Sequence, residues 1–187
     1  WVKDQYVVVF DDLHLPPGTQ THWHVQMVGD SQEGSLVNGG DMRLHGRFGV
    51  DLQLLMPDLP PDARETVAQV PTLEYNLPPS ECFAMRHVQV SMMSPRRVFA
   101  VLRPLAPGGV PLAATVVDGV LRIQGEGVDD TLFLFRDPAR AACGDVRFAG
   151  RYGAVLKRPQ HTTLVLLDGE TIACGAAAQE SIGEMRI

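Results

Sequence analysis

The sequence predicts an all-β protein, an antiparallel β-sandwich of two stacked sheets with little or no helix. β-Branched and aromatic runs recur along the chain, and two Asp-Gly pairs separate such runs. The 14 prolines and 18 glycines punctuate the chain with turn signals, and helical periodicity is nearly absent. At 187 residues, we expect a single sandwich domain covering 1–187.

The first half of the chain offers five candidate strands. They cover residues 6–10, 21–28, 47–54, 85–92 and 98–103. The segment 47–54 alternates apolar and polar side chains, which is typical of a half-buried strand. Between these strands, prolines flank 62–69, which predicts two turns of helix, and 57–79 as a whole predicts a long loop.

The second half continues with short strands and two hairpin signals. The candidate strands cover residues 115–117, 120–123, 131–135, 163–167, 171–172 and 181–187. Asp118-Gly119 and Asp168-Gly169 each lie between two of them and predict tight hairpins. The segment 138–143 could form one helical turn.

Composition excludes several classes of function. The net charge of −6 argues against a nucleic-acid binder, although a local basic groove could still bind an acidic sugar polymer. No apolar run reaches the ~20 residues that span a membrane. The three cysteines, Cys82, Cys143 and Cys174, form no C-x-x-C pair, so we expect small core side chains rather than a redox or zinc pair.

The segment His22-Trp23-His24 is the most informative in the chain. On a strand, residues two apart point to the same face, so the two histidines share one face and Trp23 lies opposite. Val25 and Met27 share the face of Trp23, which favours a core position for all three.

Further candidate metal ligands follow this segment. A turn-rich stretch, 29–40, leads to Asp41, which a long-looped hairpin could return alongside His24. His87 lies on a later strand. Two imidazoles and one carboxylate are a standard zinc set that leaves a fourth position for water.

The residues alone leave this assignment open. His45 competes with His87 as the third ligand, and Glu33 and Asp30 are alternative carboxylates. His22 and His24 could also be surface histidines with no metal. Arg43 and Arg47 follow Asp41 closely and are candidates for binding the carboxylates of an acidic sugar.

Two longer segments carry a family resemblance. The run from Asp4 to Asp12, followed by a turn and His22-Trp23-His24, resembles the C-terminal sheet region of heparinase II/III-like polysaccharide lyases. The run from Arg97 to Pro104 resembles a strand of that family that ends in proline. That group is similar to alginate and oligoalginate lyases, and the resemblance extends to about Asp137.

The resemblance implies a structural zinc ion and one cleft histidine. The family's H-x-H, an aspartate some seventeen residues on and a distant histidine match His24, Asp41 (41 − 24 = 17) and His87 as zinc ligands. The first histidine of the motif, His22, would face the substrate. Such lyases cleave uronic-acid polysaccharides by β-elimination, usually in the periplasm or outside the cell.

The resemblance also implies a missing partner. In the family a large α-helical toroid precedes the sheet domain and supplies the tyrosine that transfers protons. The chain begins at Trp1 without an initiating Met, so we expect this domain upstream in the same chain and little activity without it.

Two other functions compete. A non-catalytic carbohydrate-binding or structural sandwich needs no zinc and no role for His22. A cupin-type metalloenzyme also uses H-x-H on a strand, but Gly18 precedes the motif too closely and Glu33 follows too far on.

Overall fold

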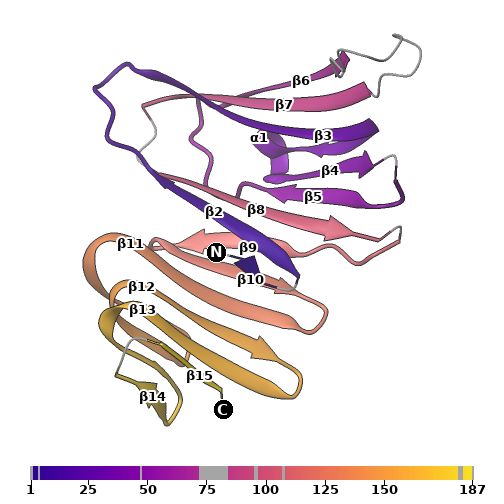
Figure 1. Ribbon diagram of the computed structural model, residues 1–187. Helices are drawn as coiled ribbons and strands as arrows, with labels where there is room; N and C mark the ends of the chain where they lie inside the picture. Colours follow the sequence, from indigo (N-terminus) through magenta and orange to yellow (C-terminus); the bar gives the residue numbers. More distant parts are fainter. Residues whose placement is uncertain are drawn as a thin grey trace. The chain divides into compact units, whose positions relative to one another are not determined.

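The computed structural model describes residues 2–3, 5–46, 48–71, 84–94, 97–106, 108–180 and 183–186. These residues form fifteen strands and one four-residue helix, and all pairing between strands is antiparallel (Figure 1). The expected class, an antiparallel all-β fold of two sheets with little helix, is confirmed. The chain divides into two compact units, Trp1–Gly109 (unit 1) and Val110–Ile187 (unit 2).

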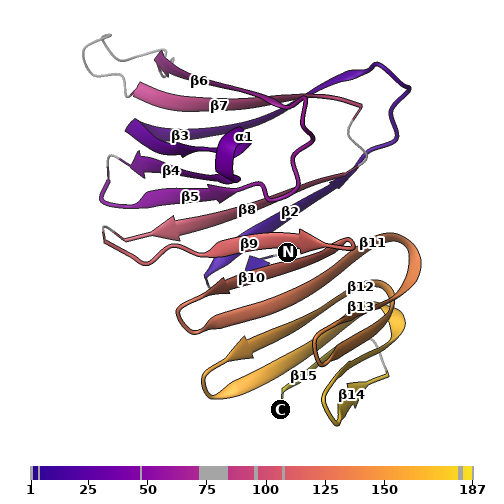
Figure 2. The ribbon, with the colours of Figure 1, turned by 180° about the vertical axis from the view of Figure 1, so that it is seen from behind.

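Unit 1 contains one eight-stranded sheet in the order β1-β2-β8-β5-β4-β3-β7-β6. Its strands are β1 (Val2–Lys3), β2 (Tyr6–Asp12), β3 (Gln20–Ser35), β4 (Asp41–Gly46), β5 (Asp51–Leu55), β6 (Arg64–Pro71), β7 (Ala84–Met93) and β8 (Arg97–Leu105). The helix α1 (Leu36–Gly39) lies against the sheet face turned to the viewer in Figure 2. Leu36 packs there into a core that includes Met42, Leu44 and Leu54.

A bulge keeps most of the polar side chains of the long strand β3 on one face. The register with β4 shifts between Gly29 and Ser31, so one residue is extra there. Before the bulge, odd-numbered residues such as Met27 pack against the core, and after it Ser31 and Glu33 point to the other side. We call this polar side, opposite the core, the outward face of unit 1.

Unit 2 contains a seven-stranded sheet. Its order is β14-β13-β12-β11-β10-β9, and β15 also pairs with β13. The strands are β9 (Ala113–Val117), β10 (Val120–Gly125), β11 (Val128–Cys143), β12 (Val146–Arg158), β13 (His161–Cys174), β14 (Ala177–Gln179) and β15 (Gly183–Arg186). Phe133, Phe148, Leu164, Leu166 and Ile172 are among the buried residues of its core.

One of the two Asp-Gly signals forms the expected hairpin. Val117 pairs with Val120, and Asp118 and Gly119 both have positive φ, 50° and 80°, as a two-residue type I′ turn requires. The prediction at Asp168-Gly169 is wrong, because β13 runs through both residues and Gly169 pairs with Gly150 on β12.

Three further segment predictions are wrong in whole or in part. Of the expected helix 62–69, residues 64–69 belong to β6, where Thr66 and Val67 pair with β7. Residues 138–143 belong to β11. Of the expected strand 47–54, residues 51–54 form as part of β5, which begins at Asp51, whereas residues 48–50 are not in a strand. A Cβ on Gly46, where β4 ends, would lie 1.7 Å from the carbonyl oxygen of Val50, so the backbone approaches itself closely there.

The structure describes two of the three cysteines and allows the described helix to be compared with the length that spans a membrane. Cys143 and Cys174 are free thiols that pack against the core of unit 2, whereas Cys82 lies outside the described residues. Within the described part of the chain, no helix is long and apolar enough to cross a membrane.

Candidate functional site

Three imidazoles gather on the outward face of unit 1, where β3 and β7 pair. His22 pairs with Ser91 in the strand register, and His24 pairs with Gln89. His87 lies two residues before Gln89 on β7, so it is the diagonal neighbour of His24. We call His22, His24 and His87 the histidine cluster; His22 and His24 are exposed and His87 is half-buried.

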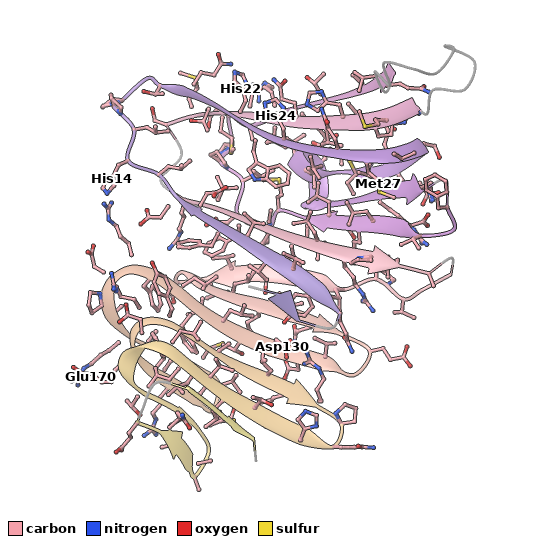
Figure 3. All side chains as sticks on the ribbon, in the orientation of Figure 1. His14, His22, His24, Met27, Asp130 and Glu170 are labelled. Carbon is pink, nitrogen blue, oxygen red and sulfur yellow. The ribbon has the colours of Figure 1, made fainter. Side chains whose placement is uncertain are left out.

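The face opposite these histidines is core, as the alternation predicts. Trp23, Val25 and Met27 pack against the buried cluster of unit 1. Figure 3 shows His22 and His24 on one side of β3 and Met27 on the other. The apolar side of β3 therefore anchors the strand to the core. The histidines on its other side are held in place but do not contribute to the core.

His24 and His87 are in direct contact. The Nδ1 atom of His24 lies 2.8 Å from Nε2 of His87, and the ring centroids are 5.0 Å apart at an interplanar angle of 27°. The His22 ring lies further along β3, with its centroid 6.1 Å from that of His24. The cluster is therefore an imidazole pair with a third imidazole beside it.

Neutral polar groups hold His22. Its Nδ1 lies 2.8 Å from Ser91 Oγ and 3.1 Å from Gln89 Nε2. The Gln89 amide also donates to Ser91 Oγ at 2.9 Å. These contacts occupy only Nδ1, and Nε2 of His22 has no hydrogen-bond partner among the residues that the structure describes.

The structure does not bring Asp41 to His24, contrary to the expected hairpin. The strand β3 continues to Ser35, and Asp41 pairs with Ser35, eleven residues beyond His24. At about 3.3 Å per residue, that separation is roughly 36 Å along the strand. The Asp41 carboxylate instead accepts from the Gln53 amide, at 3.1 Å and 3.2 Å to its two oxygens.

Arg43 is engaged by a carboxylate of the chain itself. Its guanidinium binds Asp51 Oδ2, at 2.7 Å from Nη2 and 2.8 Å from Nε. A guanidinium paired in this way would have to exchange that partner to bind the carboxylate of a sugar. Arg47, the second candidate for sugar binding, lies outside the described residues.

His45 lies between two carboxylates and not near His24. Its Nδ1 is 3.3 Å from Asp51 Oδ2, and its Nε2 is 3.3 Å from Glu33 Oε1. Asp51 is 8% exposed. Its burial alone would raise its pKa, but the Gly46 N–H, Arg43 and His45 outweigh this effect and lower the pKa.

The zinc set implied by the resemblance fits the structure in two positions of three. His24 and His87 offer two nitrogens, which zinc bonds of about 2.0–2.1 Å would spread from 2.8 Å to about 3.3 Å. The carboxylate of the set lies elsewhere. Within the described ranges, no group of three His, Cys, Asp or Glu side chains is placed to hold a metal ion.

Comparisons with known proteins add no family. No family model matches the chain, and neither the curated proteins nor the solved structures contain a match.

Sequence reasoning missed the polar partners of the histidine cluster. Gln89 and Ser91 follow His87 at intervals of two, so they share its face, and this alternation was the signal that could have found them. Asp51 gave no such signal, because its partners Arg43 and Gly46 belong to the neighbouring strand.

Proposed function

We propose that this chain is the sheet region of a lyase that cleaves uronic-acid polysaccharide by β-elimination, in the periplasm or outside the cell. The observation that supports the proposal is His22, an exposed imidazole with one nitrogen held and the other free. The resemblance of the H-x-H segment to heparinase II/III-like lyases supplies the reaction.

β-Elimination makes three demands on an active site. A base removes the proton at C5, the bond between C4 and the leaving oxygen breaks as the C4–C5 double bond forms, and that oxygen receives a proton. The negative charge of the adjacent carboxylate must also be neutralised, because it opposes removal of the C5 proton.

The partners of His22 favour the tautomer that has its proton on Nε2. The Gln89 amide nitrogen can only donate, and the Ser91 hydroxyl can donate as well, so both suit an unprotonated Nδ1. The Nε2–H group is then free to donate its proton to the substrate. Imidazole is also the side chain that changes charge near neutral pH, which suits this exchange.

We propose that zinc, when bound, is held by His24 and His87 and is structural. It would tie β3 to β7 and so fix the strand that carries His22. Asp41 is left out of this ligand set because it lies opposite Ser35 and is held by Gln53.

The partners in this proposal are an acidic polysaccharide and a helical domain in the same chain. The helical domain would supply the tyrosine for proton transfer. The described residues contain one helix, of four residues, so that domain would have to come from elsewhere.

The decisive test is an activity assay of the natural-length protein on heparan-, alginate- and hyaluronan-type polymers. Product is followed by the ultraviolet absorbance of the new double bond conjugated to the carboxylate. We expect His22→Ala to lower kcat by roughly 10²–10⁴-fold, the range for losing a general acid or base. His161→Ala, on β13, is the control and should leave kcat unchanged. Full activity in His22→Ala, or no cleavage of any of the three polymers, would refute the proposal.

Elemental analysis of the purified chain tests the metal assignment. We expect about one zinc ion per chain, lost in His24→Ala and in His87→Ala because each removes one of two protein ligands. Asp41→Ala is the matched control and should keep the metal. Loss of zinc in Asp41→Ala would restore the three-ligand set, and a metal-free wild-type chain would leave His24 and His87 as a hydrogen-bonded imidazole pair.

A further inference from the structure

A groove crosses the sheet of unit 2. Two hollows, of about 370 Å³ and about 470 Å³, lie over β11, β12 and β13. Both are bordered by Arg140, Ala149 and Glu170, and they extend from there in opposite directions along β12. The two hollows adjoin at these shared residues, and we call them together the groove.

Part of the floor of the groove is built from residues without side chains. Gly150 pairs with Gly169, and the register between β12 and β13 shifts on both sides of Gly150. A Cβ on Gly150 would lie 2.4 Å from Gly169 Cα, and one on Gly169 would lie 2.6 Å from the carbonyl oxygen of Ala149. Larger residues would clash with the neighbouring backbone at these two positions, so no side chains project from this part of the floor.

Two arginines and two carboxylates border the groove; Asp168 is already bound by Arg151, whereas Arg140, Arg147 and Glu170 are available to a ligand. Arg140 Nη2 lies 4.0 Å from Glu170 Oε2, and these side chains are 88% and 80% exposed, so the pair is weak and easily separated. Figure 3 labels Glu170 at the edge of the ribbon of unit 2. Arg147, which also borders the groove, is exposed and has no ion-pair or hydrogen-bond partner among the described residues.

We propose that this groove binds a carboxylate-bearing segment of an acidic polysaccharide. Arg140 would exchange Glu170 for a sugar carboxylate, and Arg147 would bind a second one, since guanidinium groups pair well with carboxylates. The released Glu170 would accept hydrogen bonds from sugar hydroxyls. The class of ligand rests on the proposed function, whereas the site lies in a different unit from the histidine cluster.

The strand pairing argues against an extended peptide as the occupant. A peptide that joins a sheet uses the free backbone groups of an edge strand. The groove lies over β12, which is paired with β11 on one side and β13 on the other. A ligand here must be read by side chains, and the side chains present suit carboxylates and hydroxyls.

Calorimetric titration of the purified chain with tetrasaccharides tests the site. The probes are alginate-, heparan- and hyaluronan-type tetrasaccharides, with a neutral tetrasaccharide as the control ligand. We expect saturable binding to at least one acidic probe, weakening with added salt. The double variant Arg140→Gln/Arg147→Gln should weaken it by about tenfold or more, as loss of charge-assisted pairs implies. Ala149→Leu should also weaken it, by filling the floor.

The controls separate this site from the histidine cluster. Arg122→Gln, which removes a cation paired with Asp129 on another part of the sheet, should bind as the wild-type chain does once circular dichroism shows that all variants are folded. No binding to any acidic tetrasaccharide, or equally tight binding of a glutamate oligopeptide, would overturn the proposal. So would binding that His22→Ala abolishes and the arginine variant leaves intact. Binding that depends on the arginines, in a natural-length protein without lyase activity, would refute only the proposed reaction.

Discussion

The histidine cluster of unit 1 and the Asp130–Arg158 pair of unit 2 gather polar side chains in opposite ways. Asp130 is fully buried, and Arg158 binds it through two contacts, Nη1 to Oδ1 at 2.5 Å and Nη2 to Oδ2 at 3.0 Å. The Lys157 N–H donates to the same carboxylate at 3.1 Å. His22 and His24 are exposed, and neutral groups or another imidazole contact them.

This difference in burial decides whether the side chains can exchange partners without loss of stability. Removing one partner of a buried ion pair leaves the other charge uncompensated inside the protein, so we expect the loss of Asp130 to destabilise the fold. An exposed imidazole can change its charge or its partner while water replaces the lost contact. The core beneath His22 and His24 is formed by Trp23, Val25 and Met27 and does not depend on the histidines.

The largest effect is expected from breaking the buried pair. Asp130→Ala should lower the free energy of unfolding of unit 2 by about 3–5 kcal/mol, because Arg158 is left largely buried without its partner. Urea unfolding followed by circular dichroism measures this loss. Following the NMR amide signals of β11 and β12 during the urea titration would show that the loss of stability is in unit 2.

The neighbouring residue provides a matched control. Asp129 pairs with Arg122 at 3.2 Å, but its side chain is 44% exposed. Asp129→Ala should therefore cost less than about 1 kcal/mol. If Asp129→Ala and Asp130→Ala destabilise unit 2 equally, burial does not distinguish the two carboxylates and the comparison fails.

The sequence predicted those parts of the fold and site that depend on local patterns. Alternation along 21–28 placed His22 and His24 opposite Trp23, and Asp118-Gly119 formed its hairpin because both residues tolerate positive φ. The position of Asp41 could not be predicted in this way.

Two features of β3 explain that failure. The glycine-rich composition of 29–40 resembles a loop, yet β3 continues through most of it, with a bulge after Gly29. The length of a paired strand depends on its partner, here β4, and that partner lies outside any local window of sequence. For the same reason Asp168-Gly169 became a close contact with Gly150 and not a turn.

The cluster around Asp51 lies between the two extremes and gives a smaller, pH-dependent effect. Asp51 is nearly buried like Asp130, but its partner His45 is partly exposed. Asp51→Asn should lower the free energy of unfolding of unit 1 by about 2 kcal/mol near neutral pH, because it weakens hydrogen bonds from Arg43 and the Gly46 N–H to a charged group.

The sign of the pH dependence follows from the lowered pKa of Asp51. A carboxyl whose pKa is lower in the folded state contributes stability above its unfolded pKa of about 3.9, and this contribution is lost as the pH falls through the folded value. The difference between wild type and Asp51→Asn should therefore be largest near neutral pH and shrink in acid. Tryptophan fluorescence reports unit 1, because Trp1 and Trp23 both lie in residues 1–109. A difference that stays constant or grows as the pH falls would show that Asp51 is not held as a carboxylate, and would place it with the exposed polar groups.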